Sequence, residues 1–289
     1  VLRNIQITDI IKSVMDTWEV VSDELVITGS NNVESHFIAT AVPIYSKDSI
    51  SGAVLTLHDI TRLKKLEEMR KDFVANVSHE IKTPITAIQG FTETLIDGAI
   101  DDKDNAMRFL MMIKAHSERL NRLVEDLLTL SKIEFGDILI NKIDVDIKNV
   151  IDTVFMTLKE KADQKGLYLK SSIKDVETIY GDRDKLIQIL LNLVENGIKF
   201  TETGGITVGT ERQGFKSVLY VQDTGIGIPQ KDISRLGERF YRVDRARSRE
   251  LGGTGLGLAI VKHLVKAHKW DMNIESKVGV GTRINIICN

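Results

Sequence analysis

The sequence predicts an α+β chain of several domains: a small strand-rich part, a helical hairpin and a compact α/β sandwich. Three observations support this. Apolar residues alternate before position 59, they recur every three or four residues after position 60, and helical and strand patterns mix in the second half. Glycine is sparse in the first half and clustered at 225–227 and 252–257. The length of 289 residues suggests roughly two domains of ordinary size.

Composition and charge exclude several classes of protein. Hydrophobic residues make up 42% and charged residues 28%, which excludes a disordered or fibrous chain. The net charge of −2 gives no global signature of nucleic-acid binding. No apolar run approaches the ~20 residues that span a bilayer. The lone cysteine, Cys288, permits neither an internal disulfide nor a cysteine-based zinc site.

Residues 1–58 alternate in the manner of β-strands. His36–Ile44 and Gly52–His58 are predicted strands joined by a polar connection. Because so few strands enclose only a small core, we interpret residues 1–58 as part of a larger domain.

A long amphipathic helix is predicted from position 59, since Ile60, Leu63, Leu66 and Met69 recur every three residues. A turn over residues 96–102 ends it, and a second, partly heptad-like helix follows. A lone hairpin leaves its apolar stripes uncovered, so two hairpins are predicted to dimerise into a four-helix bundle. The helical linker is placed at 59–72 and the dimerisation domain at 73–135.

Residues 136–289 are predicted to form the α/β sandwich. The expected helices are Val150–Asp163, Asp184–Phe200 and Gly255–His268, and the expected strands are Leu167–Ile173, Gly205–Glu211, Ser217–Gln222, Asn273–Ser276 and Thr282–Ile287.

His79 is the first candidate site. On a helical wheel it lies opposite the apolar stripe that contains Val77 and Ile81, so it is expected to face water beside Glu80 and one turn before Thr83. A carboxylate that accepts the ring proton frees the lone pair of the other nitrogen and makes the imidazole a nucleophile. Pro84 removes a helical hydrogen bond and is expected to loosen the turn beside it. The alternative is an ordinary surface His–Glu pair.

A nucleotide pocket is the second candidate site, although neither a Walker loop nor a Rossmann loop is present. Asn192 and Asn196 lie one turn apart on an apolar helix, and with Lys199 they could hold a metal ion and phosphate oxygens. Helix-surface amides are the alternative. Asp223 ends a strand before Gly225 and Gly227, and it could accept a hydrogen bond from the amine of adenine.

The glycine-rich run 252–258 leads into a helix and could cradle phosphate with backbone N–H groups. Before it, the polar stretch 239–250 is predicted to form a mobile lid, from which Arg242 could reach the terminal phosphate. Most of 244–250 is interpreted as a solvated charge run.

In this order the motifs resemble those of the sensor histidine kinases of two-component systems. The family's H, N, G1, F and G2 boxes resemble, in turn, Phe73–Pro84, Asn192–Lys199, Asp223–Pro229, Arg239–Arg242 and Gly253–Gly257. The sequence around His79 is most similar to those of PhoR-type and WalK-type kinases. Residues 1–58, followed by Asp59-Ile60-Thr61, resemble the C-terminal part of a PAS sensor domain, and the sandwich resembles the GHKL (Bergerat) ATP-binding fold.

The resemblance implies a role for each matching residue. His79 would accept the γ-phosphoryl group of ATP, Glu80 would take the ring proton, Thr83 would orient water for dephosphorylation of the partner, and Asn196 would coordinate Mg²⁺. The ATP-binding residues would be Asn192, Asn196, Lys199, Phe200, Asp223, Gly225, Gly227, Phe240, Arg242, Gly253, Thr254, Gly255, Leu256, Gly257 and Thr282. The chain departs from the family at Gly197 and Phe200, where many members have Ala and Tyr, and at Lys269-Trp270, where Gly-Gly is usual.

The resemblance also implies an activity and partners. The chain would be a homodimeric protein-histidine kinase that uses ATP and Mg²⁺, passes the phosphoryl group to an Asp of a response regulator of the OmpR/PhoB-like class, and also dephosphorylates that regulator. It would not bind nucleic acid itself, and it would be the cytoplasmic portion of a membrane-anchored bacterial sensor. The alternatives are a GHKL-type ATPase or chaperone, for which Glu195 is the candidate acid, and a non-enzymatic sensor and dimerisation module.

Overall fold

A computed structural model describes residues 5–29, 33–46, 49–134, 139–244 and 253–288. The chain divides into two compact units, Val1–Val77 and Ser78–Asn289, which are described separately. Helix α2 (Thr61–Ile96) begins in the first unit and ends in the second. Among the described residues, no helix has an apolar stretch long enough to cross a membrane.

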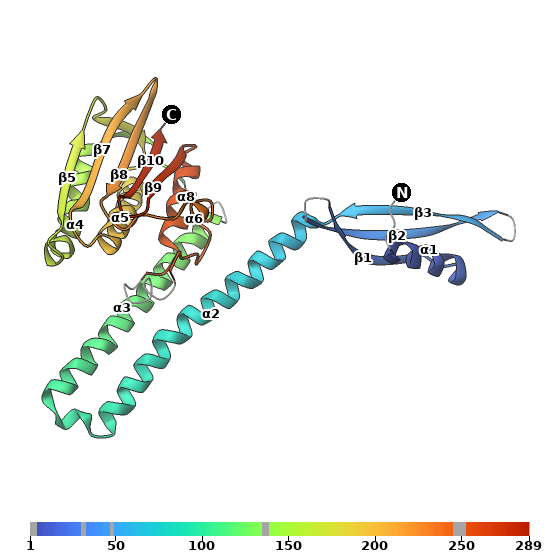
Figure 1. Cartoon of the computed structure of the whole chain (residues 1–289), viewed down its shortest axis with the longest axis horizontal. Coiled ribbons are helices and arrows are strands. Elements are labelled where there is room, and N and C mark those ends of the chain that lie inside the picture. Colours follow the sequence, from blue (N-terminus) through green and yellow to red (C-terminus); the bar gives the residue numbers. More distant parts are fainter. Residues whose placement is uncertain (1–4, 30–32, 47–48, 135–138, 245–252, 289) are drawn as a thin grey trace. The chain divides into compact units, whose positions relative to one another are not determined.

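The first unit contains helix α1 (Ile5–Thr17) and an antiparallel sheet in the order β1-β2-β3 (Figure 1). The strands are β1 (Val21–Thr28), β2 (Glu34–Ser46) and β3 (Ser49–Asp59). The core lies between α1 and one face of the sheet, and it consists of Ile7, Ile10, Val14, Leu25, Ala39 and Ala41. Both predicted strands are present and longer than expected, whereas α1 and β1 were not predicted. The assignment to a PAS-like domain stays a prediction.

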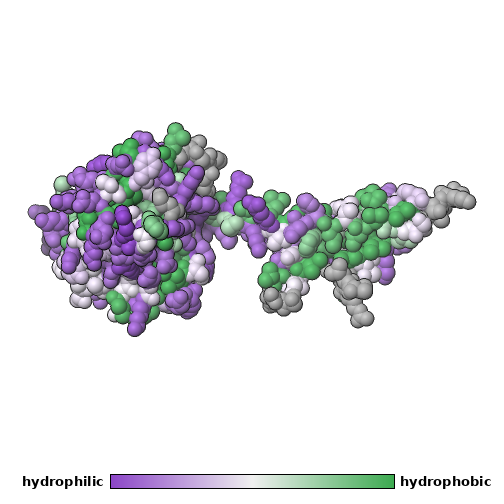
Figure 2. Space-filling view, turned by 90° about the horizontal axis from the view of Figure 1, so that it is seen from above, coloured by the Kyte–Doolittle hydropathy of each residue, from purple (hydrophilic) through white to green (hydrophobic). Residues whose placement is uncertain are grey.

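The other face of this sheet carries exposed β-branched side chains, namely Val26, Val42, Ile44 and Val54. In Figure 2, hydrophobic side chains gather over one face of this unit.

The helical hairpin consists of α2, a short 3₁₀ helix (Ala99–Asp101) and α3 (Lys103–Glu134). Gly98 makes the turn with a φ of 116°, which a residue with a side chain rarely adopts. Helix α2 is continuous through Pro84, so the expected loosened turn does not interrupt it. The predicted hairpin is therefore present.

The α/β domain is built on a five-stranded sheet in the order β5-β7-β8-β10-β9 (Figure 1), in which only β5 and β7 pair in parallel. Helix α5 lies between α4 and α8 and packs on β7 and β8. A separate pair of strands, β4 and β6, is antiparallel. The elements are β4 (Ile143–Asp146), α4 (Ile147–Gln164), β5 (Tyr168–Ile173), β6 (Thr178–Gly181), α5 (Arg183–Phe200), β7 (Gly205–Gln213), β8 (Lys216–Asp223), α6 (Gln230–Ile233), α8 (Gly257–Ala267), β9 (Asp271–Lys277) and β10 (Gly281–Cys288).

This arrangement confirms the predicted α+β architecture. The core of the domain is apolar and includes the fully buried Ile189, Leu190, Ile206, Leu219 and Ile260. Strands β4 and β6 were not predicted, because each has only four residues and shows too little periodicity to be recognised.

The turn after α8 forms without the usual glycine pair. Lys269 adopts a φ of 61°, in the left-handed region, and Trp270 then donates its backbone N–H to the carbonyl of Val265 at 3.0 Å. The buried Trp270 ring packs on Gly181, where an added Cβ would lie 2.7 Å from the indole. The departure at Lys269-Trp270 therefore costs one unfavourable backbone conformation and gains a buried aromatic contact.

His268 ties this turn to the start of α5. Its Nε2 accepts the backbone N–H of Asp182 at 3.1 Å, so the neutral ring carries its proton on Nδ1, 2.8 Å from the carbonyl oxygen of Leu264. The ring stacks on Trp270 with centroids 4.2 Å apart. Burial lowers the pKa of His268, because the charged form would lose its hydration.

Candidate functional site

His79 lies exposed on α2, as predicted. The half-buried Thr83, one turn later, donates its hydroxyl to the backbone carbonyl of His79 at 3.0 Å. An exposed imidazole can be reached by a reactant, so this position fits a phosphoryl acceptor.

The carboxylate of Glu80 lies between two guanidinium groups. Its Oε2 accepts a hydrogen bond from Nη2 of Arg119 at 2.9 Å and another from Nη2 of Arg242 at 3.0 Å. The side chains of Glu80, Arg119 and Arg242 are 12%, 11% and 6% exposed. From the sequence, Glu80 was predicted to lie beside His79, and Arg242 was predicted to bind a phosphate. The structure joins Glu80 and Arg242 in one ion pair.

The base end of the candidate pocket is defined here as Phe200, Asp223, Gly225, Gly227 and Thr282. It is brought together from the end of α5, the end of β8 with the loop that follows it, and β10. Oδ1 of Asp223 accepts the backbone N–H of Gly225 at 2.8 Å and that of Thr282 at 3.2 Å. Burial raises the pKa of Asp223, and the two N–H groups oppose that effect. The carboxylate is therefore held in one orientation by backbone atoms.

The two glycines of this end allow the chain segments to approach closely. A Cβ on Gly225 would lie 2.5 Å from the carbonyl oxygen of Phe200. Gly227 has a φ of 68°, and a Cβ there would lie 2.1 Å from the carbonyl oxygen of Lys277. Thr282 is buried, and its hydroxyl lies 2.8 Å from that of Ser276.

The phosphate end, defined as Asn192, Asn196, Lys199, Arg242 and residues 253–257, lies at α5 and the start of α8. Asn192 donates its amide to the carbonyl of Gln188, and its Oδ1 would lie 2.6 Å from a Cβ on Gly257. Gly255 has a φ of 76° and accepts the backbone N–H of Phe240 at 3.0 Å. Leu256 is fully buried in the core, whereas Gly253 and Thr254 before it are half-buried.

Thr254 also contacts the hairpin. Its hydroxyl donates to Oδ2 of Asp126 on α3 at 2.7 Å. Burial raises the pKa of the Asp126 carboxyl, and the hydrogen bond from Thr254 opposes this. Two predicted phosphate-binding residues, Arg242 and Thr254, are thus engaged by carboxylates of the two hairpin helices.

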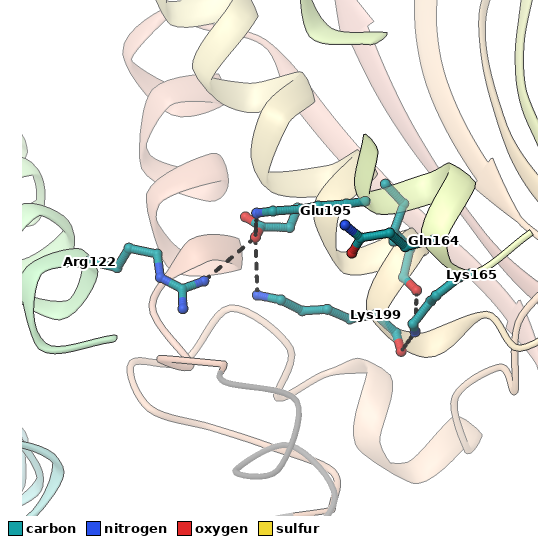
Figure 3. Close-up of a pocket in the computed structure, with 7 residues that line it drawn as sticks. Arg122, Gln164, Lys165, Glu195 and Lys199 are labelled. Carbon is teal, nitrogen blue, oxygen red and sulfur yellow. Dashed lines mark hydrogen bonds and ion pairs between the residues drawn. The ribbon is translucent and has the colours of Figure 1, made fainter. Parts of the chain in front are cut away.

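A cavity of about 250 Å³ adjoins Lys199 and is lined by side chains of α3, α4 and α5. Figure 3 shows Arg122 and Lys199 reaching toward the carboxylate of Glu195, with Nζ of Lys199 3.7 Å from Oε1. Lys161 forms the shortest contact with that oxygen, at 2.9 Å. Burial lowers the pKa of Lys199 and acts to raise that of Glu195, but the cations around Glu195 hold its pKa below the usual range. Glu195 is therefore an ion-paired carboxylate, which does not favour the ATPase alternative.

The chemistry of Asn196 fits a magnesium site completed by a nucleotide. Asn196 is half-buried on α5, one turn from Asn192. Mg²⁺ prefers oxygen ligands and usually keeps substrate phosphates and water in its shell. Among the described residues there is no cluster of three or more His, Cys, Asp or Glu that could hold a metal. An ion held between one amide oxygen and substrate phosphates is consistent with this donor set.

Three residues of α3 in the site were missed from the sequence: Arg119, Arg122 and Asp126. A usable signal was present, because Arg119 and Asp126 share the helix face of the buried Leu123 and Leu130, at spacings of four, three and four. Charged residues on an apolar face indicate a specific partner. The predicted lid residues 245–250 lie outside the described part of the chain.

Comparison with known families identifies two domains. The model described as "His Kinase A (phospho-acceptor) domain" matches residues 69–136. The model described as "Histidine kinase-, DNA gyrase B-, and HSP90-like ATPase" matches residues 181–288. His79 lies within the first match, and the base end and phosphate end lie within the second.

The relatives point the same way. Sensor histidine kinase WalK of Bacillus subtilis (strain 168) is 40% identical over 238 residues, which cover 81% of this chain and 39% of that protein. Sensor protein SrrB of Staphylococcus aureus (strain NCTC 8325 / PS 47) is 36% identical over 233 residues, 80% of this chain and 40% of that protein. The chain thus spans about two fifths of these relatives. The structure of Acinetobacter baumannii histidine kinase AdeS is similar with a TM-score of 0.59 and 28% identity, and the match covers 73% of this chain and 97% of that one.

Proposed function

We propose that this chain, which belongs to the sensor histidine kinase family by its two matched domains and its relatives, is an ATP-dependent protein-histidine kinase that phosphorylates its own His79. One observation carries the proposal. Arg242, predicted to bind phosphate, touches the carboxylate of Glu80 at 3.0 Å, and Glu80 directly follows the exposed His79. This contact supports the proposal, because it joins a residue predicted to bind phosphate to the helix that carries the predicted acceptor.

The proposed reaction uses both ends of the pocket. Asp223 accepts a hydrogen bond from the exocyclic amine of adenine, while Lys199, Arg242 and the N–H groups of residues 253–257 hold the phosphates. Asn196 would hold Mg²⁺, which when bound would neutralise charge at the phosphate oxygens. One ring nitrogen of His79 attacks the γ-phosphorus in line, the bond from that phosphorus to the oxygen of ADP breaks, and the ring proton passes to Glu80.

The partners are part of the same proposal. Two hairpins pair into a four-helix bundle, which is supported by exposed apolar residues along α2 and α3 such as Ile85, Leu110, Met111 and Leu128. The phosphoryl group then passes to an Asp of a response regulator of the OmpR/PhoB-like class. Thr83 orients water when the same surface removes that group, because its hydroxyl oxygen can accept a hydrogen bond from water while it donates to the His79 carbonyl. Attachment of the whole protein to a membrane stays a prediction.

The test is incubation with ATP labelled at the γ-phosphate. We expect an acid-labile, base-stable label on the protein that His79→Ala abolishes. His116→Ala, which changes a histidine on the other helix of the hairpin, is the matched control and should keep the label. A label that survives in His79→Ala would refute the assignment of the acceptor.

The second activity is tested separately with a phosphorylated regulator. Thr83→Ala should keep labelling from ATP and lose regulator dephosphorylation. Equal loss of both activities would contradict a specific role for the Thr83 hydroxyl, because it would show a general defect of the helix.

A further inference from the structure

Arg119 is a buried cation of α3 whose guanidinium points into the hairpin. The residue is 9% exposed and its Nη2 donates to Oε2 of Glu80 at 2.9 Å. A charged group loses hydration when it is buried, and only a well-placed counter-charge compensates for that loss. Glu80 therefore supplies the counter-charge that stabilises the buried Arg119 between α2 and α3.

A second cation shares the same carboxylate oxygen but belongs to another part of the fold. Arg242 follows α6 in the α/β domain, and its Nη2 lies 3.0 Å from Oε2 of Glu80. In the proposed reaction Arg242 moves to the phosphates. The contact with Arg119 lies wholly within the hairpin, so it remains when Arg242 leaves.

Resting on the proposed function, we infer that Arg119 is a positioning residue for phosphorylation of His79. Arg119 keeps Oε2 of Glu80 occupied throughout the reaction, which fixes the carboxylate and assigns Oε1 to the ring proton of His79. When the nitrogen–phosphorus bond forms and the bond from the γ-phosphorus to ADP breaks, that proton moves to Oε1. Without Arg119, the carboxylate is free to rotate away from the ring, and the transfer slows although ATP binds normally.

The first measurement separates positioning from nucleotide binding. Arg119→Gln should lower the rate of His79 labelling at saturating ATP by about ten- to a hundredfold, because loss of orientation acts on the chemical step. The ATP concentration at half-maximal rate should stay unchanged, and Arg119→Lys, which restores a donor and the charge, should recover part of the rate. The control is Lys114→Gln, since Lys114 is a cation of the same helix that is 78% exposed.

The second measurement asks whether Arg119 acts through Glu80. In a double-mutant cycle, Arg119→Gln should have no further effect on the labelling rate of Glu80→Gln. An equal loss in both backgrounds would overturn the inference, even if Arg119→Gln were partly misfolded. A wild-type rate in Arg119→Gln, or a loss confined to the ATP concentration required, would overturn it as well.

These outcomes are distinct from failure of the proposed function. If His79→Ala retains the label, the acceptor is wrong, whatever Arg119 does. If only wild-type protein and Lys114→Gln label at the full rate, and the cycle is non-additive, both statements stand.

Discussion

The base end and the phosphate end of the proposed nucleotide pocket are held by different partners. At the base end, the carboxylate of Asp223 is fixed by backbone N–H groups of Gly225 and Thr282, all within the α/β domain. At the phosphate end, Arg242 and Thr254 contact carboxylates that belong to the helical hairpin. Under the proposed function, one end is therefore organised before a nucleotide arrives, whereas residues of the other end exchange the hairpin for the phosphates.

This difference has a consequence for the order of events. Backbone-held groups cost little reorganisation on binding. The single hydroxyl proton of Thr254, by contrast, is donated to Asp126 and must be released before it can be donated to a phosphate. Changes at the base end should thus weaken ATP binding. Changes that release the phosphate end from the hairpin should strengthen it.

The largest effect is expected at Gly227. An alanine there has both a positive φ and a Cβ 2.1 Å from the carbonyl oxygen of Lys277, so Gly227→Ala should cost about 3 kcal/mol or more and abolish ATP binding. Gly214 is the matched control, because it has a φ of 61° and nothing within 4 Å of an added Cβ. Gly214→Ala should cost about 1–2 kcal/mol and leave ATP binding intact. Urea unfolding and calorimetric titration with ATP measure both quantities, and similar results for the two variants would contradict this account of the loop.

Asp223 should set the preference for adenine. Asp223→Asn removes the charged acceptor, so ATP affinity should fall about ten- to a hundredfold, in line with a hydrogen bond to a charged group. Inosine triphosphate, which lacks the exocyclic amine, should bind the wild-type protein weakly and the variant about as well as ATP does. If the variant still prefers ATP as strongly as the wild type, Asp223 does not read the base.

Release of the phosphate end should have the opposite sign. Asp126→Ala removes the acceptor of Thr254 on α3, so ATP affinity should rise by about two- to tenfold, the value of one ordinary hydrogen bond. Glu125→Ala changes the adjacent, exposed carboxylate and should leave the affinity unchanged. A weaker affinity in Asp126→Ala would show that the hairpin contact supports nucleotide binding.

The smallest effect is expected at His268, which follows the end of α8 and accepts a hydrogen bond from Asp182 at the start of α5. Because burial lowers its pKa, the folded ring stays neutral while the unfolded ring takes up a proton below about pH 6.5. Stability is thus fully present above that pH and falls as the pH drops toward the folded pKa, by at most ~1.4 kcal/mol per pH unit. In His268→Gln, unfolding free energies between pH 7.5 and 5 should depend less on pH, with ATP affinity at pH 7.5 unchanged. A slope equal to the wild type would assign the dependence to other groups.

The sequence was sufficient for the elements whose signals are local. The two long helices α2 and α3, the apolar helix α5 and the exposed His79 could all be predicted, because each depends on spacing along one segment. The glycines that follow Asp223 in the sequence, and the glycine-rich run that packs against Asn192 in the structure, were also predicted to belong to the pocket.

Contacts between distant segments could not be predicted in the same way. Arg119 and Glu80 are 39 residues apart, and Arg242 and Glu80 are 162 apart. No spacing rule reports which charges meet across a hairpin or between a hairpin and a sheet. The sequence therefore predicted Arg242 as a phosphate ligand, whereas its contact with Glu80 emerged only from the fold.

The most direct test of the exchange at the phosphate end is a disulfide formed by the double variant Asp126→Cys, Thr254→Cys. These positions are chosen because Oδ2 of Asp126 and the hydroxyl oxygen of Thr254 lie 2.7 Å apart. Cysteines at both positions can be oxidised without interference from Cys288, which is buried and whose pKa burial raises to about 12. Labelling of His79 by ATP is then compared in the oxidised and reduced forms of the same protein. The account predicts a loss of about tenfold or more on oxidation, with recovery on reduction, because the locked segment cannot reach the phosphates. Equal labelling of the two forms would contradict the claim that the phosphate end must leave the hairpin.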